Sequence, residues 1–188
     1  MTAFAPVQTV PPTGLPVSIF EARAHLRVDG TDEDELIAAL IEAAVDHLDG
    51  WSGILGRCIM AQTWRQDFDC FEGCIRLPFP DVQSVTVQYY DTANTLQTVS
   101  ATNYYLVNRV DGSRIEISPY SVWPVTALRP DAVRVTMVCG YTTVPASLKA
   151  AILLHIGALY VNRESVSETS LLPFAYDALV QKHRMVGT

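Results

Sequence analysis

Apolar residues recur at helical spacing near both ends of the chain. Residues 32–49 predict a helix with one apolar face, formed by Leu36, Ile37, Leu40, Ile41, Ala44 and Leu48. Residues 145–163 are apolar on most sides, which is typical of the central helix of a bundle. A last short helix is expected over residues 174–180. Together these stretches predict a small helical bundle built from both ends of the sequence.

Capping signals indicate where the first two helices begin. Ser18 and Glu21 have the spacing of a capping box, in which the serine hydroxyl accepts an amide and the glutamate reaches back. They predict a short helix that ends near Leu26. Gly30 interrupts it, and residues 31–34 (TDED) predict a second, similar box.

Between the helical stretches, the pattern changes to the alternation of short β-strands. Strands are predicted at residues 62–68, 75–77, 82–90, 104–107, 114–117 and 133–138. In the last of these, Val133, Val135 and Met137 alternate with polar residues and are expected to face a core. Asp111 and Gly112 form a strong hairpin-turn signal between two strands. This region therefore predicts a small antiparallel sheet or sandwich.

These patterns give an α+β fold in three parts. Residues 1–16 contain four prolines and no periodicity, so they are expected to form a flexible N-terminal arm. Residues 17–57 together with 141–184 form the expected helical core. Residues 58–140 are the β-rich insertion.

Size and charge limit the classes of function. A chain of 188 residues can bury about 70% of its unfolded surface, so it needs no disulfide or metal to be stable. Its net charge of −7 argues against general DNA binding, which requires clustered lysine and arginine, but suits a surface that DNA slides past. Four cysteines without a signal peptide indicate a reducing cytoplasm. The longest apolar run, 150–161, is too short to span a membrane, so no membrane partner is expected.

The sequence motifs favour neither an enzyme nor a metal site. Cys70 and Cys74 have a CxxxC spacing that Cys58 and Cys139 could complete, but structural zinc usually uses tighter, matched pairs. His155 lies in an apolar helix and is interpreted as a satisfied core histidine. No GxSxG, HExxH, phosphate-binding glycine loop or calcium-loop motif is found. We therefore expect no catalytic residue, no cofactor and no metal.

Acidic residues mark a second face of the predicted helix 32–49. Two interpretations stay open for this face: a solvated surface, or a surface that meets a subunit, a basic partner or the lumen of a ring. The residues are Glu35, Glu42, Asp46 and Asp49.

Several pieces of the chain, in their order and spacing, resemble the head–tail connector (adaptor) proteins of tailed phages. The resemblance covers residues 16–184 and is closest to the variant with a β insertion, as found in prophages and gene transfer agents. Its pieces are residues 16–28 (PVSIFEARAHLRV), 32–34 (DED), 62–64 (QTW), 77–80 (LPFP), 85–91 (VTVQYYD), 140–145 (GYTTVP) and 162–164 (NRE).

The resemblance implies a structural subunit of a twelvefold homo-oligomeric ring. Such a protein is made in the bacterial cytoplasm and ends up at the head–tail junction of a virion or phage-like particle. There the ring binds the portal protein, carries a stopper or tail-completion protein, and extends a channel through which DNA passes without sequence-specific binding. Glu35, Glu42, Asp46 or Asp49 would then face this channel or an adjacent subunit.

The resemblance also assigns a docking segment for the portal. In the family, the C-terminal segment typically reaches up to the portal, and here it corresponds to residues 173–184. The residues expected to dock are Phe174, Tyr176, Leu179, Lys182, His183 and Arg184.

Two other interpretations of the chain stay open. One is a neighbouring ring protein, the stopper or the tail terminator. The other is a monomeric β-module that binds a small ligand or glycan through Tyr89, Tyr90, Tyr104 and Tyr105. Adjacent residues of a strand point to opposite faces, so at most half of these tyrosines could serve one site.

Overall fold

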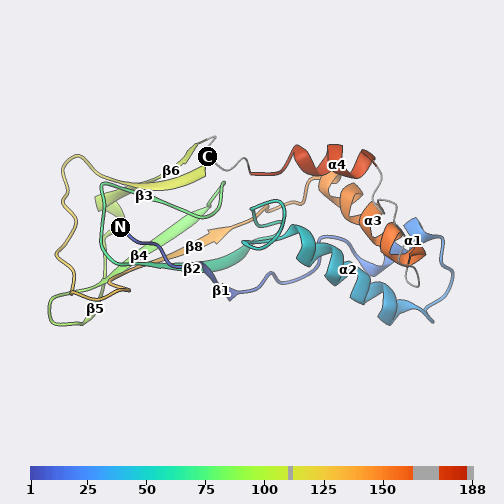
Figure 1. The fold of residues 1–188 in the computed structure, drawn as a ribbon, viewed down its shortest axis with the longest axis horizontal. Coiled ribbons are helices and arrows are strands. Elements are labelled where there is room, and N and C mark those ends of the chain that lie inside the picture. The colour runs from blue at the N-terminus through green and yellow to red at the C-terminus, as the bar shows by residue number, and fades with distance from the viewer. Residues whose placement is uncertain (110–111, 163–173, 186–188) are drawn as a thin grey trace. The chain divides into compact units, whose positions relative to one another are not determined.

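A computed structural model describes residues 1–109, 112–162 and 174–185 (Figure 1). The chain forms two compact units. The β unit consists of Met1–Pro12, Ala61–Gly140 and Met185–Thr188, and the helical unit consists of Thr13–Met60 and Tyr141–Arg184. Helices and antiparallel sheets occupy different units, which confirms the predicted α+β class.

The helical unit is built around one central helix. Its helices in the described residues are α1 (Ile19–Leu26), α2 (Asp34–Leu48), α3 (Ala146–Val161) and α4 (Phe174–Gln181). Helix α3 packs against the other three, as its all-round apolar sequence predicts. The fully buried core residues from these helices include Ile37, Ile41, Leu48, Leu148, Ile152 and Ile156.

Only the first of the two predicted capping boxes is present. Ser18 caps α1: its backbone N–H donates to the Glu21 carboxylate at 2.8 Å, and its hydroxyl accepts the Glu21 N–H at 3.2 Å. The box expected over residues 31–34 is wrong, because Glu33 is the N-cap of α2 and makes no side-chain capping bond. The Glu33 carboxylate instead accepts a hydrogen bond from the hydroxyl of Tyr160.

The β unit contains two antiparallel sheets in the described residues. The larger has the order β1 (Val7–Val10), β2 (Gln62–Phe68), β8 (Val133–Cys139), β4 (Ser84–Tyr90) and β5 (Leu96–Thr98). The smaller has the order β3 (Cys74–Arg76), β7 (Gly112–Ile117) and β6 (Tyr104–Arg109), and a short 3-10 turn, Ala101–Asn103, precedes β6. Along β8, the predicted inward residues Val133, Val135 and Met137 are all fully buried.

The predicted flexible arm is wrong for residues 7–10. They form edge strand β1, with Val7 opposite Arg65 and Val10 opposite Thr63 of β2. Nearer the terminus, the Phe4 N–H donates to the Asp67 carbonyl at 3.0 Å. All four side chains of β1 are exposed, so the segment has no buried face and hence no periodicity that could reveal it.

The predicted hairpin joins β6 and β7, which pair from Tyr104↔Ile117 to Arg109↔Gly112. Asp111 of the turn signal lies outside the described residues, whereas Gly112 has φ 122°, a value that favours glycine.

Candidate functional site

Helix α2 carries three acidic side chains in one exposed stripe. Glu42 follows Glu35 by seven residues and Asp46 follows Glu42 by four, spacings that return to nearly the same side of a helix. All three side chains are exposed. We call these three residues the acidic stripe. What it faces in an assembly stays a prediction.

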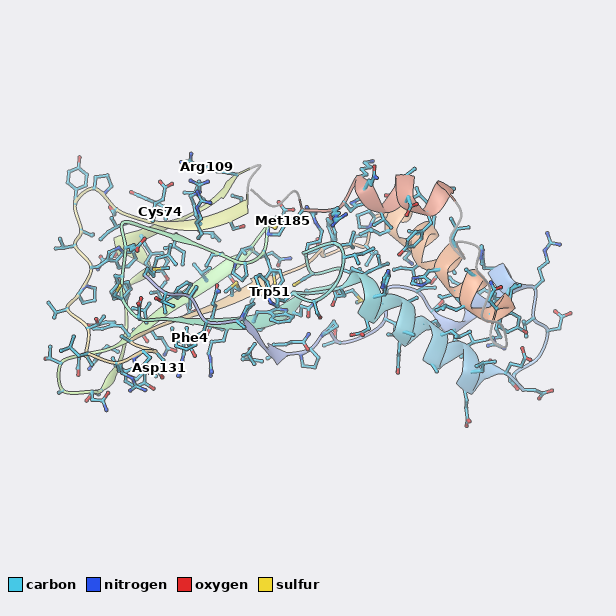
Figure 2. All side chains as sticks on the ribbon, viewed as in Figure 1. Phe4, Trp51, Cys74, Arg109, Asp131 and Met185 are labelled. Atoms are coloured by element: carbon cyan, nitrogen blue, oxygen red, sulfur yellow. The ribbon has the colours of Figure 1, made fainter. Side chains whose placement is uncertain are left out.

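Asp49, the fourth residue of the predicted acidic face, has a structural role. It is half-buried at the C-terminal end of α2, and its carboxylate accepts the N–H of Ile59 at 2.5 Å. This bond fastens the loop between α2 and β2 back onto the helix. The same loop exposes Trp51 just after α2 (Figure 2).

The six residues expected to dock on the portal are not all exposed. Tyr176 and His183 are buried inside the helical unit, and Leu179 packs partly against its core. Lys182 and Arg184 are exposed at the end of α4, and the side chain of Phe174 lies outside the described residues. Of the six, therefore, Lys182 and Arg184 present a basic surface, whereas Tyr176 and His183 hold α4 in place.

Two histidines and a tyrosine form part of the contact between α4 and the rest of the helical unit. The rings of His155 and Tyr176 meet edge to face, with their centres 5.4 Å apart, and the rings of His47 and His155 also meet edge to face, with their centres 5.0 Å apart. Burial, together with nearby His47, lowers the pKa of His155, and burial raises the pKa of Tyr176 to about 12. Neither His155 Nδ1 nor the Tyr176 hydroxyl has a hydrogen-bond partner in the described residues, so His155 is a core histidine that is not fully satisfied.

His183 fixes the far end of α4. Its Nε2 lies 2.7 Å from the hydroxyl of Ser147, and its Nδ1 lies 3.3 Å from the hydroxyl of Tyr141. Burial lowers the pKa of His183, and the positive charges of Arg57 and Lys182 lower it further. The neutral imidazole is therefore the form that fits this contact.

In the part of the chain that the structure describes, neither a candidate metal site nor a candidate membrane span is found. No group of three or more His, Cys, Asp or Glu residues is arranged there to hold a metal ion. Cys58 and Cys139 are buried, and Cys70 and Cys74 are partly exposed free thiols. Of the described helices, none combines the length and the apolar character that a bilayer crossing requires.

The four tyrosines of the ligand-binding alternative lie on two sheets, and Tyr89 and Tyr104 both approach the stacked rings of Phe71 and Trp123. Tyr104 is buried and Tyr105 is exposed on β6, in the smaller sheet. Tyr89 and Tyr90 lie on β4, in the larger sheet. The ring of Tyr90 is covered by the guanidinium of Arg129, which lies 3.7 Å from its centre.

One exposed apolar feature was missed in the sequence. Between β7 and β8, a loop leaves four large apolar side chains almost uncovered, and we call them the apolar strip: Tyr120, Val122, Val125 and Leu128. Pro119, Pro124 and Pro130 indicate an irregular connection in the sequence, but they do not reveal the exposed apolar side chains. The signal in the sequence that could have indicated them is the absence of charged residues from Ile117 to Leu128.

Among the comparisons with known proteins, matches were found only with solved structures. No protein-family model and no curated protein matches the chain. The fold is similar to that of a chain in the neck of an empty gene transfer agent (GTA) particle computed with C6 symmetry, at 20% identity and a TM-score of 0.81, covering 98% of this chain and 97% of that one.

Two further solved structures are similar to this chain over almost its whole length. A chain in the virion of a native GTA particle is 21% identical with a TM-score of 0.79, over 98% of this chain and 97% of that one. A chain in the neck of a native GTA particle computed with C12 symmetry is 22% identical with a TM-score of 0.70, over 100% and 97%. At these identities, the likeness shows a shared fold across essentially the whole chain.

Proposed function

We propose that this chain is a structural, non-catalytic subunit of the neck of a phage-like particle. More specifically, it acts as a head–tail adaptor: a homo-oligomeric, twelvefold ring that binds beneath the portal and extends the DNA channel. The ring also carries the stopper or tail-completion protein on its other side.

The observation that supports this proposal best is the full-length likeness of fold to a neck chain. The match covers 98% of this chain and 97% of that one, so both units take part in it. The sequence motifs that resemble the adaptor family span residues 16–184 and are a second, separate support. A fold alone does not fix a function, so the proposal also needs surfaces suited to the role.

The acidic stripe provides one such surface. Duplex DNA carries about one negative charge per 1.7 Å of its axis and binds tightly to clustered lysine and arginine. Exposed carboxylates at Glu35, Glu42 and Asp46 would keep a channel wall from holding DNA in place. We therefore assign the acidic stripe to the lumen or to the adjacent subunit.

The end of α4 provides the other surface. Lys182 and Arg184 are exposed there, next to the buried His183 that fixes the helix. Such a basic end suits an acidic surface on the portal. Tyr176 and Leu179 contribute indirectly, because they anchor α4 to the helical core.

The proposal is tested by locating the chain in particles from its host. An affinity-tagged copy is purified together with its partners, which are identified by mass spectrometry and imaged by cryo-electron microscopy. A ring of this chain attached to the portal is the expected result.

Two other results would contradict the adaptor role. Recovery with tail proteins alone would favour the stopper or tail terminator. A monomer recovered without any particle protein would overturn the neck assignment, and binding of that monomer on a glycan array would favour the ligand-binding module.

A further inference from the structure

The smaller sheet of the β unit has one buried face and one more exposed face. On the buried face, Ile75 of β3 lies directly opposite Ile115 of β7, and both side chains are fully buried. Successive side chains of a strand point to opposite faces, so the residues on either side of these two lie on the exposed face. The charged strand residues on that face are Arg76 of β3, Arg114 and Glu116 of β7, and Arg109 of β6. We call the three arginines the arginine face.

Like charges meet on the arginine face. Arg76 lies directly opposite Arg114 in the pairing of β3 with β7, and like charges in that position destabilise a sheet. Glu116 is the acidic strand residue on this face, and its carboxylate accepts a hydrogen bond from Nη2 of Arg109 at 3.0 Å. The strands therefore present three positive charges and one negative charge here, in a chain whose net charge is −7. Such a face favours an anionic partner.

The arginine face is accessible at both of its outer strands. Arg76 on β3 and Arg109 on β6 are exposed, and so is Tyr105, which shares the face. A guanidinium group binds a carboxylate through two parallel N–H···O bonds, which fixes orientation as well as contact. Carboxylate side chains are therefore the chemistry that this surface fits.

The acidic stripe on α2 offers carboxylates over a similar distance. Glu35 and Asp46 are eleven positions apart, which is about 16 Å at the rise of an α-helix. Arg76 and Arg109 are separated by about 10 Å across the sheet and about 7 Å along it, from the usual strand spacings. Long, flexible arginine side chains cover the remaining difference in length. The two surfaces thus match in size and are opposite in charge.

The stripe carboxylates are available for such a contact. Glu35, Glu42 and Asp46 are all exposed, and within the described residues none of them forms an ion pair. The stripe belongs to the helical unit, whereas the arginine face belongs to the β unit. Two different patches on one subunit are what a head-to-tail ring contact requires.

We propose that the arginine face of one copy binds the acidic stripe of the next copy in the ring. This inference rests on the proposed ring function and deepens it, because it selects the adjacent subunit, and not the channel lumen, as the partner of the stripe. Exposed ion pairs are individually weak. Their main contribution is to steer neighbouring subunits together and to fix their register.

Reversing charge on the arginine face tests the contact in particles. The variant Arg76→Glu/Arg109→Glu places carboxylates opposite the stripe of the neighbouring copy, and like charges across an interface oppose its formation. The expected effect is at least a tenfold loss of the chain from particle necks. Thermal unfolding stays unchanged, because both side chains are exposed.

A second reversal on the stripe is expected to restore the contact. The combined variant Arg76→Glu/Arg109→Glu/Glu42→Lys/Asp46→Lys again brings opposite charges together, so its incorporation should return to within about twofold of wild type. A fold defect in the β unit would not be corrected by changes on α2. The matched control is Arg76→Glu/Arg109→Glu/Asp29→Lys/Asp32→Lys, which has the same net charge but changes exposed residues outside the stripe. This control should stay as poorly incorporated as Arg76→Glu/Arg109→Glu.

The outcomes separate this contact from the function on which it rests. If wild type forms a ring at the neck but the combined variant is no better incorporated than Arg76→Glu/Arg109→Glu, the contact is overturned and the adaptor role is left intact. Normal incorporation of Arg76→Glu/Arg109→Glu has the same meaning, and a fall in its DNA delivery alone would assign the arginine face to DNA phosphates. Absence of the wild-type chain from the neck overturns both proposals.

Discussion

At the scale of single residues, Gly53 leaves no room for a side chain in the helical unit. A Cβ atom there would lie 2.3 Å from the Asp49 carbonyl oxygen and 2.4 Å from the carbonyl of Leu48. Gly53→Ala is therefore expected to lower the free energy of unfolding by about 3 kcal/mol, as overpacking does elsewhere. Thermal or urea unfolding measures this, with Gly14→Ala as the control, because a Cβ at Gly14 meets nothing within 4 Å. Equal stability of the two variants would contradict the prediction.

Local sequence signals predicted residue roles well where the deciding contacts are local. The bonds between Ser18 and Glu21 span three residues, and spacing alone was enough to predict them. Glu33 shows the opposite case. Its carboxylate accepts a hydrogen bond from Tyr160, which is distant in the sequence, so the local spacing could not predict its role. The burial of Tyr176 likewise comes from contacts between helices, which no pattern within α4 reveals.

At the scale of elements, the docking of α4 is expected to depend on pH. His155 and His183 both have a lowered pKa in the folded chain, so the unfolded chain binds protons first as the pH falls. The free energy of unfolding of the helical unit should therefore decrease from pH 7.5 to pH 5. Urea unfolding across this range measures the slope, and His155→Leu should reduce it. The control His25→Gln, at an exposed position on α1, should keep the wild-type slope.

The exposed end of α4 allows a test of portal docking that leaves the helix intact. Lys182→Glu/Arg184→Glu reverses both exposed charges while Tyr176 and His183 keep α4 packed. We expect at least a tenfold loss of binding to the portal with no change in thermal unfolding. A pull-down with the portal at low and high salt measures this, since an exposed charge contact weakens with salt. Unchanged binding would remove these two residues from the docking surface.

Elements with a buried face could be predicted from the sequence, and elements without one could not. Buried and less buried residues alternate along β8, and apolar residues recur at helical spacing along α2, because one side of each element lies in a core. β1 has four exposed side chains, so it was interpreted as part of a flexible arm. The anchored loop before β8 depends on Trp123 and Phe71, a contact between distant segments that spacing cannot report.

At the scale of the whole molecule, the acidic stripe links the helical unit to the proposed channel. Glu42→Lys/Asp46→Lys places two cations where DNA would pass or where an adjacent subunit would lie, so we expect a tenfold or greater fall in particle yield or in DNA delivery. Counting particles separately from delivered DNA distinguishes an assembly defect from a passage defect. Asp29→Lys/Asp32→Lys is the matched control, because it makes the same change of charge at exposed positions outside the stripe. If both double variants behave like wild type, the stripe is a solvated face.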